Sequence, residues 1–468
     1  MHKPNATFLV ALVMVSLMLS LGELKFAFGV SIPLEHTISH RQSTRTFTSQ
    51  NISSQQLLQV LETAYGYTND HRSTPPIGLE YSLVIFPVNT TGSYQYFPET
   101  NSLTIHDLTV NKETIRSNDQ NWPSDASIVL VIVWNSTKMD NVYFASAEAG
   151  CFVQNVYLAA ASLNLGTCCV GGINSGGLQS NLKLLSAMIP LLVMPLGHPI
   201  DPYPPASPAY DRMNGNLPWV LYSNNSFEEA IHSITISKNW SSQDLSLQEC
   251  SQLLWAAYGY CNTSHRTTPD SFGIYSLTVL LSNATGVYQY IPQNHSVTEL
   301  LANDKRYDIA NACSGQIWAA DAPAIFLIIY DSLHNNGSTG DGGVLPHEWM
   351  EVNAGTVAQQ IFLEASAWNL SSNLIGDCLE EWNGTVAEEL RGIIGMTSSI
   401  VPLHILPVGH KATAVDTTPP NITNVSQSPP LNNVFPEDEV RVNATIIDVL
   451  SGVRHVNLSY RKHIVQRG

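Results

Sequence analysis

The sequence predicts an α+β protein: two tandem copies of one α/β sandwich unit that form a pseudo-dimer, followed by a partial β-sandwich module. Three observations lead to this prediction. The chain repeats itself at a shift of about 193 residues, each copy has an apolar run of strand length, and each has an alanine-rich stretch with helical spacing. A repeat of this length indicates two copies of a domain, because solenoid proteins repeat units of about 20 to 50 residues.

The repeat is recognisable at several places in the same order. Residues 55–67 return as residues 248–260, and the Tyr-Ser-Leu of residues 81–83 returns at residues 275–277. The later matches are residues 92–96 with 286–290, Trp122, Asp125 and Ala126 with Trp318, Asp321 and Ala322, residues 149–155 with 354–360, and residues 195–198 with 407–410. We therefore assign residues 30–212 to copy one and residues 213–414 to copy two.

Within each copy, we expect a central sheet covered by helices. Residues 127–134 and 324–330 are uninterrupted apolar runs, which are typical of strands that are buried on both faces. Residues 152–165 and 357–370 show helical spacing with alanine-rich faces, so they are predicted to supply the helical cover.

The N-terminal residues 1–29 are typical of an export signal. His2 and Lys3 precede an apolar stretch over residues 8–21, and residues 27–29 have the small-x-small pattern of a cleavage site. A retained membrane anchor is the alternative, but the stretch is shorter than the roughly 20 residues that span a bilayer. Sixteen Asn-x-Ser/Thr sequons further favour a glycosylated protein that is extracellular or at the cell surface.

The composition changes after copy two. Residues 416–420 are linker-like, and residues 440–445 alternate as half-buried strands do. We expect residues 415–468 to hold a linker and the opening strands of an immunoglobulin-like module. The module is predicted to be truncated in this sequence, because such a sandwich needs about 100 residues.

Composition argues against several kinds of partner. The net charge is -17 and no basic run occurs, so nucleic acid is not expected as a partner. The seven cysteines form no CxxC pair and lie near no histidine cluster, so no metal site is predicted. One disulfide would be compatible with an oxidising compartment, although the sequence does not choose its pair and the adjacent Cys168 and Cys169 rarely bond to each other.

Residues 41–47 (RQSTRTF) carry the first candidate site. Alternate residues of an extended segment point the same way, so Arg41, Ser43 and Arg45 can converge on one phosphate through charge-assisted hydrogen bonds. Alone, such a string is a weak signal and is more typical of a solvated basic strand. Two further segments follow it in order: residues 75–83 (PPIGLEYSL), and the glycines at 171 and 172 after residues 163–166.

Together these three segments resemble the FMN-dependent nitroreductase family, particularly its branch of thiazole/oxazole-forming peptide dehydrogenases. They correspond to that family's RxSxRxF opening, its PSxGxxYPL segment and its flavin-edge loop. The resemblance implies that Arg41, Ser43 and Arg45 bind the phosphate and ribityl chain of FMN. It also implies that the backbone of Gly171 and Gly172 approaches the isoalloxazine N5, although Gly171 stands where many relatives have an acidic residue. A glycine-rich turn without a chemical role is the alternative.

The family forms dimers with flavin at the subunit interface, so the tandem copies suggest a fused dimer. By this resemblance, Pro269, Asp270 and Ser271 of copy two would complete the site of copy one. The copy-two counterparts of residues 41, 43, 45 and 47 are Ile234, Ile236, Lys238 and Trp240, and Asp377 stands opposite Gly172. Because apolar residues cannot hold a phosphate, we predict that only one flavin site remains.

Other polar residues remain open between a functional and a structural role. His198 and His410 occupy matching positions where relatives often place a phosphate contact, but a histidine at a strand end is commonly structural. Glu148 and Tyr143 precede the central helix and could line a substrate pocket, whereas glutamate is also favoured in the first turn of a helix.

The predicted function is an exported FMN-binding oxidoreductase that transfers two electrons to a small-molecule or peptide substrate. The flavin would supply the chemistry, so no catalytic side chain is predicted and the absence of a triad does not count against it. The alternative is a catalytically inactive surface or binding protein that keeps the scaffold. Export favours the alternative, because FMN and NAD(P)H are abundant inside cells.

Overall fold

The computed structural model describes residues 32–68, 71–78, 80–116, 122–201, 203, 207–262, 265–270, 273, 275–331, 347–375, 384–412, 421–428 and 441–447. The expected export signal therefore lies outside the described residues, as do Ser271, Asp377 and most of the predicted C-terminal module. All further structural statements concern the described part of the chain.

Copy one consists of a six-stranded sheet with helices around it. Its elements are α2 (Leu34–His40), α3 (Ser54–Tyr65), β1 (Tyr67–Thr68), β2 (His71–Arg72), β3 (Leu83–Val88), β4 (Ser93–Phe97), β5 (Ser102–Asp107), the 3-10 helix η1 (Trp122–Asp125), β6 (Ile128–Asn135), α4 (Val142–Ser162), β7 (Gly166–Thr167), α5 (Ser175–Asn181) and β8 (Met188–Gly197). The sheet has the order β5-β4-β3-β6-β8-β7 with antiparallel neighbours, and β1 pairs with β2 in a separate ribbon.

Copy two repeats this architecture after the 3-10 helix η2 (Tyr210–Arg212). Its elements are α6 (Phe227–Ser233), α7 (Leu247–Tyr258), β9 (Leu277–Asn283), β10 (Gly286–Ile291), β11 (Ser296–Ala302), α8 (Arg306–Ala312), the 3-10 helix η4 (Ile317–Asp321), β12 (Ala324–Asp331), α9 (His347–Ala367), β13 (Leu370–Ser372), α10 (Thr385–Ile394) and β14 (Ile400–His410). The strand order β11-β10-β9-β12-β14-β13 is that of copy one. The predicted α+β class with two equivalent units is therefore confirmed.

The central strands are buried along their whole length, as the apolar runs predict. All residues of β6 and β12 except the last are buried, and each strand has antiparallel neighbours on both sides. Branched and aromatic side chains suit such a strand, because they fill the space between a sheet and the helices that cover it.

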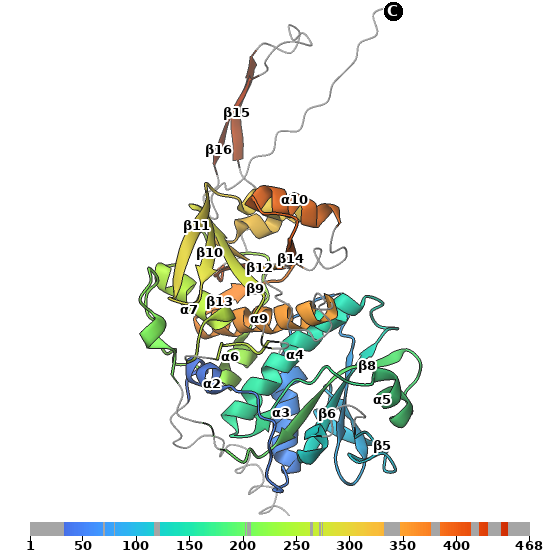
Figure 1. Cartoon of the computed structure of the whole chain (residues 1–468). Coiled ribbons are helices and arrows are strands. Elements are labelled where there is room, and N and C mark those ends of the chain that lie inside the picture. The colour runs from blue at the N-terminus through green and yellow to red at the C-terminus, as the bar shows by residue number, and fades with distance from the viewer. Residues whose placement is uncertain are drawn as a thin grey trace, which may run out of the picture.

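The two copies pack on each other through the long helices α4 and α9, which lie together between the two sheets (Figure 1). Their closest approach is at a pair of glycines. A Cβ built on Gly150 would lie 2.2 Å from the carbonyl oxygen of Val352, and one built on Gly355 would lie 2.2 Å from that of Ala147. This reciprocal contact lets the two backbones touch, which a side chain at either glycine would prevent.

Both helices begin earlier in the chain than the sequence predicts. The apolar pattern placed their starts at residues 152 and 357, whereas α4 begins at Val142 and α9 at His347. Because the helices are buried on nearly all sides between the copies, their apolar residues are not confined to one face, so helical spacing does not show where they begin. The Asn141 side chain caps α4 by accepting hydrogen bonds from the backbone of Tyr143 and Phe144.

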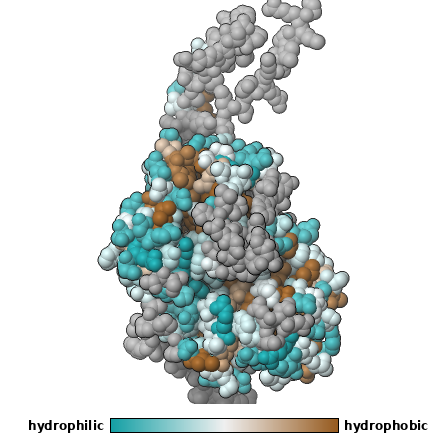
Figure 2. Space-filling model, in the orientation of Figure 1, coloured by the Kyte–Doolittle hydropathy of each residue, from teal (hydrophilic) through white to brown (hydrophobic). Residues whose placement is uncertain are grey.

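One apolar core runs through both copies. It joins residues of α2, α3 and α4 with residues of α6, α7 and α9, including Tyr157 of copy one and Phe362 of copy two at equivalent places on the long helices. Two smaller clusters lie on the outer faces of the sheets. Figure 2 shows that, on the face drawn, the hydrophobic residues of the surface form separate patches. Only 13% of residues are charged, so uncharged polar groups make up much of the surface.

The two strands after copy two, β15 (Asn421–Ser428) and β16 (Arg441–Ile447), form an antiparallel pair that projects from the copy-two end of the molecule (Figure 1). This agrees with the alternating pattern of that segment. Their assignment to an immunoglobulin-like module stays a prediction.

Candidate functional site

A cavity of about 300 Å³ lies between the two copies, and we call it the inter-copy cavity. Copy one lines it with Ser43, Arg45, Trp122, Val153, Tyr157, Cys168, Cys169, Val170, Gly171 and Gly172, and copy two lines it with Pro269, Asp270, Trp349, Val352, Asn353 and Thr356. Six of the nine residues predicted to bind a cofactor are in this set: Ser43, Arg45, Gly171, Gly172, Pro269 and Asp270. The structure thus brings together three segments that are far apart in the sequence.

The segment with Ser43 and Arg45 is extended, as predicted. Ser43 forms a parallel β-bridge with Thr167, and Phe47 forms an antiparallel one with Pro199. The pairing fixes the direction of alternate side chains, so Ser43 and Arg45 reach the same cavity. The Ser43 hydroxyl lies 3.0 Å from the Tyr157 hydroxyl, and Arg45 is exposed.

Arg41 does not line the cavity with them. It is 3% exposed, and it donates hydrogen bonds to the carbonyl oxygens of Arg266 at 2.9 Å and Thr267 at 3.2 Å. Its guanidinium also lies 5.1 Å from the ring centre of Tyr157. Arg41 therefore fixes the copy-two segment that carries Pro269, and its contact with a phosphate stays a prediction.

That copy-two segment is held from both copies. The carbonyl oxygen of Thr267 also accepts hydrogen bonds from Gln154 of α4 at 3.4 Å and from Gln360 of α9 at 3.3 Å. Beside it, the guanidinium of Arg266 lies 4.4 to 4.9 Å from the ring centres of three tyrosines, Tyr258, Tyr260 and Tyr275. Cation-π contacts of this kind stabilise the buried charge.

In copy one, the equivalent residues Arg72 and Ser73 are held by the same kinds of contact. Arg72 lies among Tyr65, Tyr67 and Tyr81, and the carbonyl oxygen of Ser73 accepts a hydrogen bond from Gln359 at 3.1 Å. Arg72 and Arg266, each surrounded by tyrosines, were not predicted from the sequence. The signal was present, because His-Arg-x-Thr-Pro occurs at residues 71–75 and again at residues 265–269.

Gly171 and Gly172 follow a strand-like contact at the rim of the sheet. Val170 and Val193 exchange backbone hydrogen bonds of 2.9 and 3.0 Å, which places the glycines at the cavity wall. A Cβ built on Gly171 would lie only 1.7 Å from two ring carbons of Trp349. In this structure the indole of Trp349 lies against Gly171, and the approach of this backbone to a flavin ring stays a prediction.

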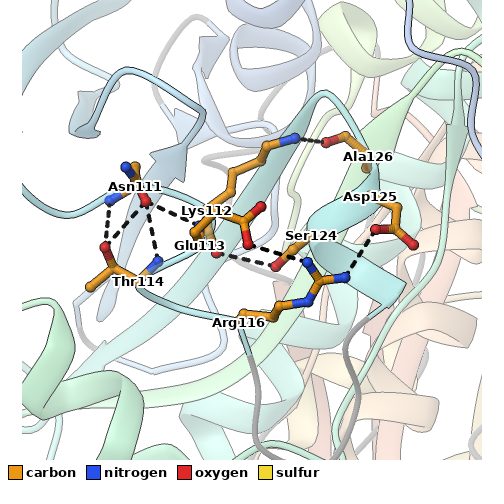
Figure 3. Close-up of polar contacts among 8 residues, drawn as sticks. All are labelled: Asn111, Lys112, Glu113, Thr114, Arg116, Ser124, Asp125 and Ala126. Atoms are coloured by element: carbon orange, nitrogen blue, oxygen red, sulfur yellow. Dashed lines mark hydrogen bonds and ion pairs between the residues drawn. The ribbon is translucent and has the colours of Figure 1, made fainter.

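Trp122 lines the cavity and stands at the start of the 3-10 helix η1. A polar cluster holds the other end of this helix (Figure 3). The Lys112 ammonium donates to the carbonyl oxygen of Ala126, and the Ser124 hydroxyl donates to that of Lys112 at 3.2 Å. Arg116 forms an ion pair of 3.2 Å with Asp125. The Lys112 side chain is buried, and this burial lowers the pKa of its ammonium group. In copy two, Arg306 makes the equivalent bond to Ala322 at 2.8 Å.

The adjacent Cys168 and Cys169 form part of the cavity wall, and both are free thiols. The backbone N–H of Cys169 donates to the Tyr157 hydroxyl at 2.9 Å. Burial raises the pKa of the Cys169 thiol and that of the Tyr157 hydroxyl, so both are neutral at physiological pH. Among the described residues, no group of three or more His, Cys, Asp or Glu side chains is arranged to hold a metal ion.

The remaining predicted residues lie in different surroundings. Asp270 accepts a hydrogen bond of 3.2 Å from the Asn353 amide at the cavity wall. His198 is not among the lining residues, and its backbone carbonyl accepts from Thr48 at 2.8 Å. Ser271 lies outside the described residues.

Glu148 has a structural role and does not line the cavity. It is 1% exposed and accepts hydrogen bonds from the Tyr65 hydroxyl and from the backbone and hydroxyl of Ser82, the latter two at 2.9 and 2.8 Å. Burial raises its pKa, and these bonds fasten the start of β3 to α4. It is the seventh residue of α4, so the first-turn preference of glutamate does not explain it. Tyr143 instead contacts His347, with ring centres 4.0 Å apart.

The copy-two counterparts of the phosphate residues form a different arrangement. Ile236 bridges to Ser372 and Trp240 to Lys411, as Ser43 and Phe47 do in copy one, so the predicted correspondence of these positions is confirmed. Lys238, the counterpart of Arg45, places its ammonium 4.8 Å from the ring of Trp318. Its charge is therefore directed at an indole, and the neighbouring isoleucines offer no donor side chain.

Comparison with known proteins places this architecture in a family. The family model described as "Nitroreductase family" matches residues 38–198 and 233–410, which together exceed half of the chain. The chain belongs to the nitroreductase family, and it carries the family unit twice. Members of this family typically bind flavin, so the class is that of nitroreductase-like oxidoreductases.

Individual relatives cover one or both units. A curated relative from Methanocaldococcus jannaschii, assigned to the nitroreductases, is 34% identical over 187 residues, which are 36% of this chain and 93% of the relative. A crystal structure from Anabaena variabilis, also of an assigned nitroreductase, is 16% identical with a TM-score of 0.60 and covers 82% of this chain and 93% of that chain. Its likeness shows that the fold of both copies recurs in one chain. A structure from Desulfovibrio desulfuricans, crystallised with FMN, is 20% identical with a TM-score of 0.28 and covers 35% of this chain and 85% of that chain.

Proposed function

We propose that the chain is an FMN-binding oxidoreductase with a single flavin site in the inter-copy cavity, and that it transfers two electrons to an organic acceptor. The observation that carries the proposal is the composition of the cavity wall. It joins a cation and a hydroxyl, Arg45 and Ser43, to Gly171 and Gly172 and to apolar side chains from both copies. Its volume of about 300 Å³ falls at the lower end of the range for ligand pockets.

These residues fit the two chemically different ends of FMN. Arg45 and Ser43 would hold the phosphate, since a guanidinium and a hydroxyl both donate to phosphate oxygens. Valine and tryptophan side chains would exclude water from the ring. When bound, FMN supplies the two-electron chemistry, and the protein supplies orientation and electrostatics. Burial keeps the Tyr157 hydroxyl protonated, so it stays available to orient Ser43 at 3.0 Å.

The differences between the copies support a single site. The segment of copy one supplies a hydroxyl and an exposed cation to the cavity, whereas the equivalent segment of copy two has Ile236 and a lysine that lies over Trp318. In a homodimer one sequence must serve two sites. Two copies in one chain can diverge, so one site can be lost while the other is retained.

We also propose that the protein is exported and glycosylated. The apolar residues 8–21 and the sixteen sequons support this. Seven sequon asparagines in the described part of the chain are exposed, as a glycan acceptor must be: Asn51, Asn224, Asn239, Asn262, Asn294, Asn369 and Asn424. None of the helices in the described part of the chain is long and apolar enough to cross a membrane. Cell fractionation with endoglycosidase treatment tests the proposal, and an unglycosylated protein in the cytoplasm would refute it.

The flavin site is tested by the visible absorbance of the full chain after incubation with FMN and desalting. We expect about one flavin per chain in the wild type. Arg45→Ala should weaken FMN binding by roughly tenfold to a hundredfold, because it removes a charged hydrogen bond of about 1.5–3 kcal/mol. Lys238→Ala is the matched control, since it removes the equivalent cation of copy two and should leave FMN binding unchanged.

An inactive binding protein is the second candidate. Two observations favour it: Arg41 is committed to backbone carbonyls, and the Trp349 indole lies beside Gly171. If the wild-type chain stays colourless after incubation with FMN, it binds no flavin, and the inactive binding protein is the better explanation. Equal loss of flavin from the Arg45→Ala and Lys238→Ala variants would contradict the proposed location of the site.

A further inference from the structure

We infer that Trp349 is the specificity-determining residue of the site and that it limits the size of the ring system an acceptor can bring into the cavity. This inference rests on the proposed function, because it concerns which acceptors the flavin site admits. Trp349 comes from copy two but lies against Gly171 of copy one, so a single side chain of one copy shapes the site of the other.

The indole of Trp349 lies directly against Gly171. The indole ring occupies the space that any side chain at position 171 would need, since a Cβ there would lie 1.7 Å from ring carbons Cη2 and Cζ2. The φ angle of Gly171 is not in the left-handed region, so its backbone conformation does not require a glycine. The indole fills the space that a side chain at position 171 would take, and the two residues form one wall of the cavity.

Trp349 stands in the first turn of α9. A buried cluster of three side chains anchors this turn to the sheet. The Glu351 carboxyl lies 2.9 Å from Nε2 of His347 and 3.4 Å from Nε2 of His404 on β14. All three side chains are almost completely buried. A side chain on an anchored helix keeps its position better than one on a loop, so Trp349 acts as a fixed wall.

Copy one has a smaller ring at the equivalent position. There α4 carries Phe144, whose ring lies 3.8 Å from a Cβ built on Gly78, an ordinary contact distance. The positions that correspond to His347, Glu351 and His404 are Val142, Ser146 and Leu192, so copy one lacks the polar anchor. The tryptophan ring and the polar cluster that anchors its helix are therefore both in copy two, and this ring lines the same cavity as Arg45 of copy one.

The test compares 1,4-benzoquinone, a one-ring acceptor, with anthraquinone-2-sulfonate, a three-ring acceptor, in FMN-loaded full chain. Trp349→Ala should raise the ratio of kcat/KM for the three-ring to the one-ring acceptor by at least about tenfold, because it removes a wall of the cavity. In Trp349→Ala, the dissociation constant of anthraquinone-2-sulfonate should fall by a similar factor. Quenching of the flavin fluorescence, recorded without reductant, measures this constant. Trp349→Phe should give an intermediate ratio.

Phe144→Ala is the matched control and should leave both quantities unchanged. His404→Leu introduces the residue that copy one has and should relax the size limit without touching the cavity wall directly. Unchanged selectivity and affinity in Trp349→Ala that still binds flavin would overturn the inference alone. A wild type without flavin would instead overturn the proposed function, together with the inference that rests on it.

Discussion

At the scale of single residues, the interior of this protein holds several carboxyl groups whose ionisation opposes folding. Glu364 of α9 is fully buried, and it accepts a hydrogen bond of 2.9 Å from Gln252. Burial raises its pKa well above the usual value of 4.5, and the nearby carboxyl of Glu35 raises it further. Because the folded state then holds its proton more tightly than the unfolded state, the stability from this group is lost as pH rises from about 4.5 through the folded pKa.

We therefore predict that Glu364→Gln flattens the dependence of stability on pH. Glutamine keeps the shape of a protonated glutamate but cannot ionise, so the free energy of unfolding should decrease less between pH 5 and pH 8 than in the wild type. Urea denaturation at several pH values measures this. Glu388→Gln, at an exposed position of α10, should behave as the wild type does. A Glu364→Gln variant with the wild-type slope would show that Glu364 ionises normally.

The candidate site shows which residue contacts a sequence can reveal. Ser43 and Arg45 follow from alternation within one extended segment, a purely local property, and the structure brings both to the cavity. The direction of Arg41 depends on carbonyl groups 225 and 226 residues away, which no local pattern contains. Trp349 was missed for a related reason, because it lies in the part of α9 that the helical pattern does not reveal.

At the scale of elements, the crossing of α4 and α9 determines where the cavity forms. Gly150→Ala would place a Cβ 2.2 Å from a backbone oxygen of Val352, so one helix must shift. We predict a loss of about 1–3 kcal/mol in the free energy of unfolding, as overpacked cores show, and weaker FMN binding in the cavity between the helices. Chemical denaturation and flavin titration measure the two effects.

Gly392→Ala provides the control for this prediction. Gly392 lies within α10, and a Cβ built there meets nothing within 4 Å. Replacing it should stabilise the protein by about 0.5–1 kcal/mol through helix propensity alone. Equal effects of the two substitutions would mean that the close approach at Gly150 carries no packing constraint.

The sequence predicted the elements unevenly, for a physical reason. The central strands were placed to within one residue at each end, because a strand buried on both faces is an unbroken apolar run. The long helices were placed ten residues late at their starts, because burial between two copies removes the polar face that makes a helix recognisable. Their ends follow from local chemistry, since Asn164 and Asn369 adopt positive φ angles just beyond them.

At the scale of the whole molecule, the two copies share one apolar core, which contains most of the buried residues of α4 and α9. Domains with separate cores can unfold one after the other, whereas elements that share a core lose their packing together. The duplication is evident in the sequence, but the shared core is not, because each copy by itself has the pattern of a complete sandwich.

We therefore predict that the two copies unfold in one cooperative transition in differential scanning calorimetry, with equal calorimetric and van't Hoff enthalpies. Gly150→Ala weakens the contact between the copies without altering either sheet, so it should lower the temperature of that single transition. Two separate transitions in the wild type, only one of them moved by Gly150→Ala, would mean that each copy folds on its own. In that case the position of Trp349 against Gly171 would depend on docking between two independently stable units.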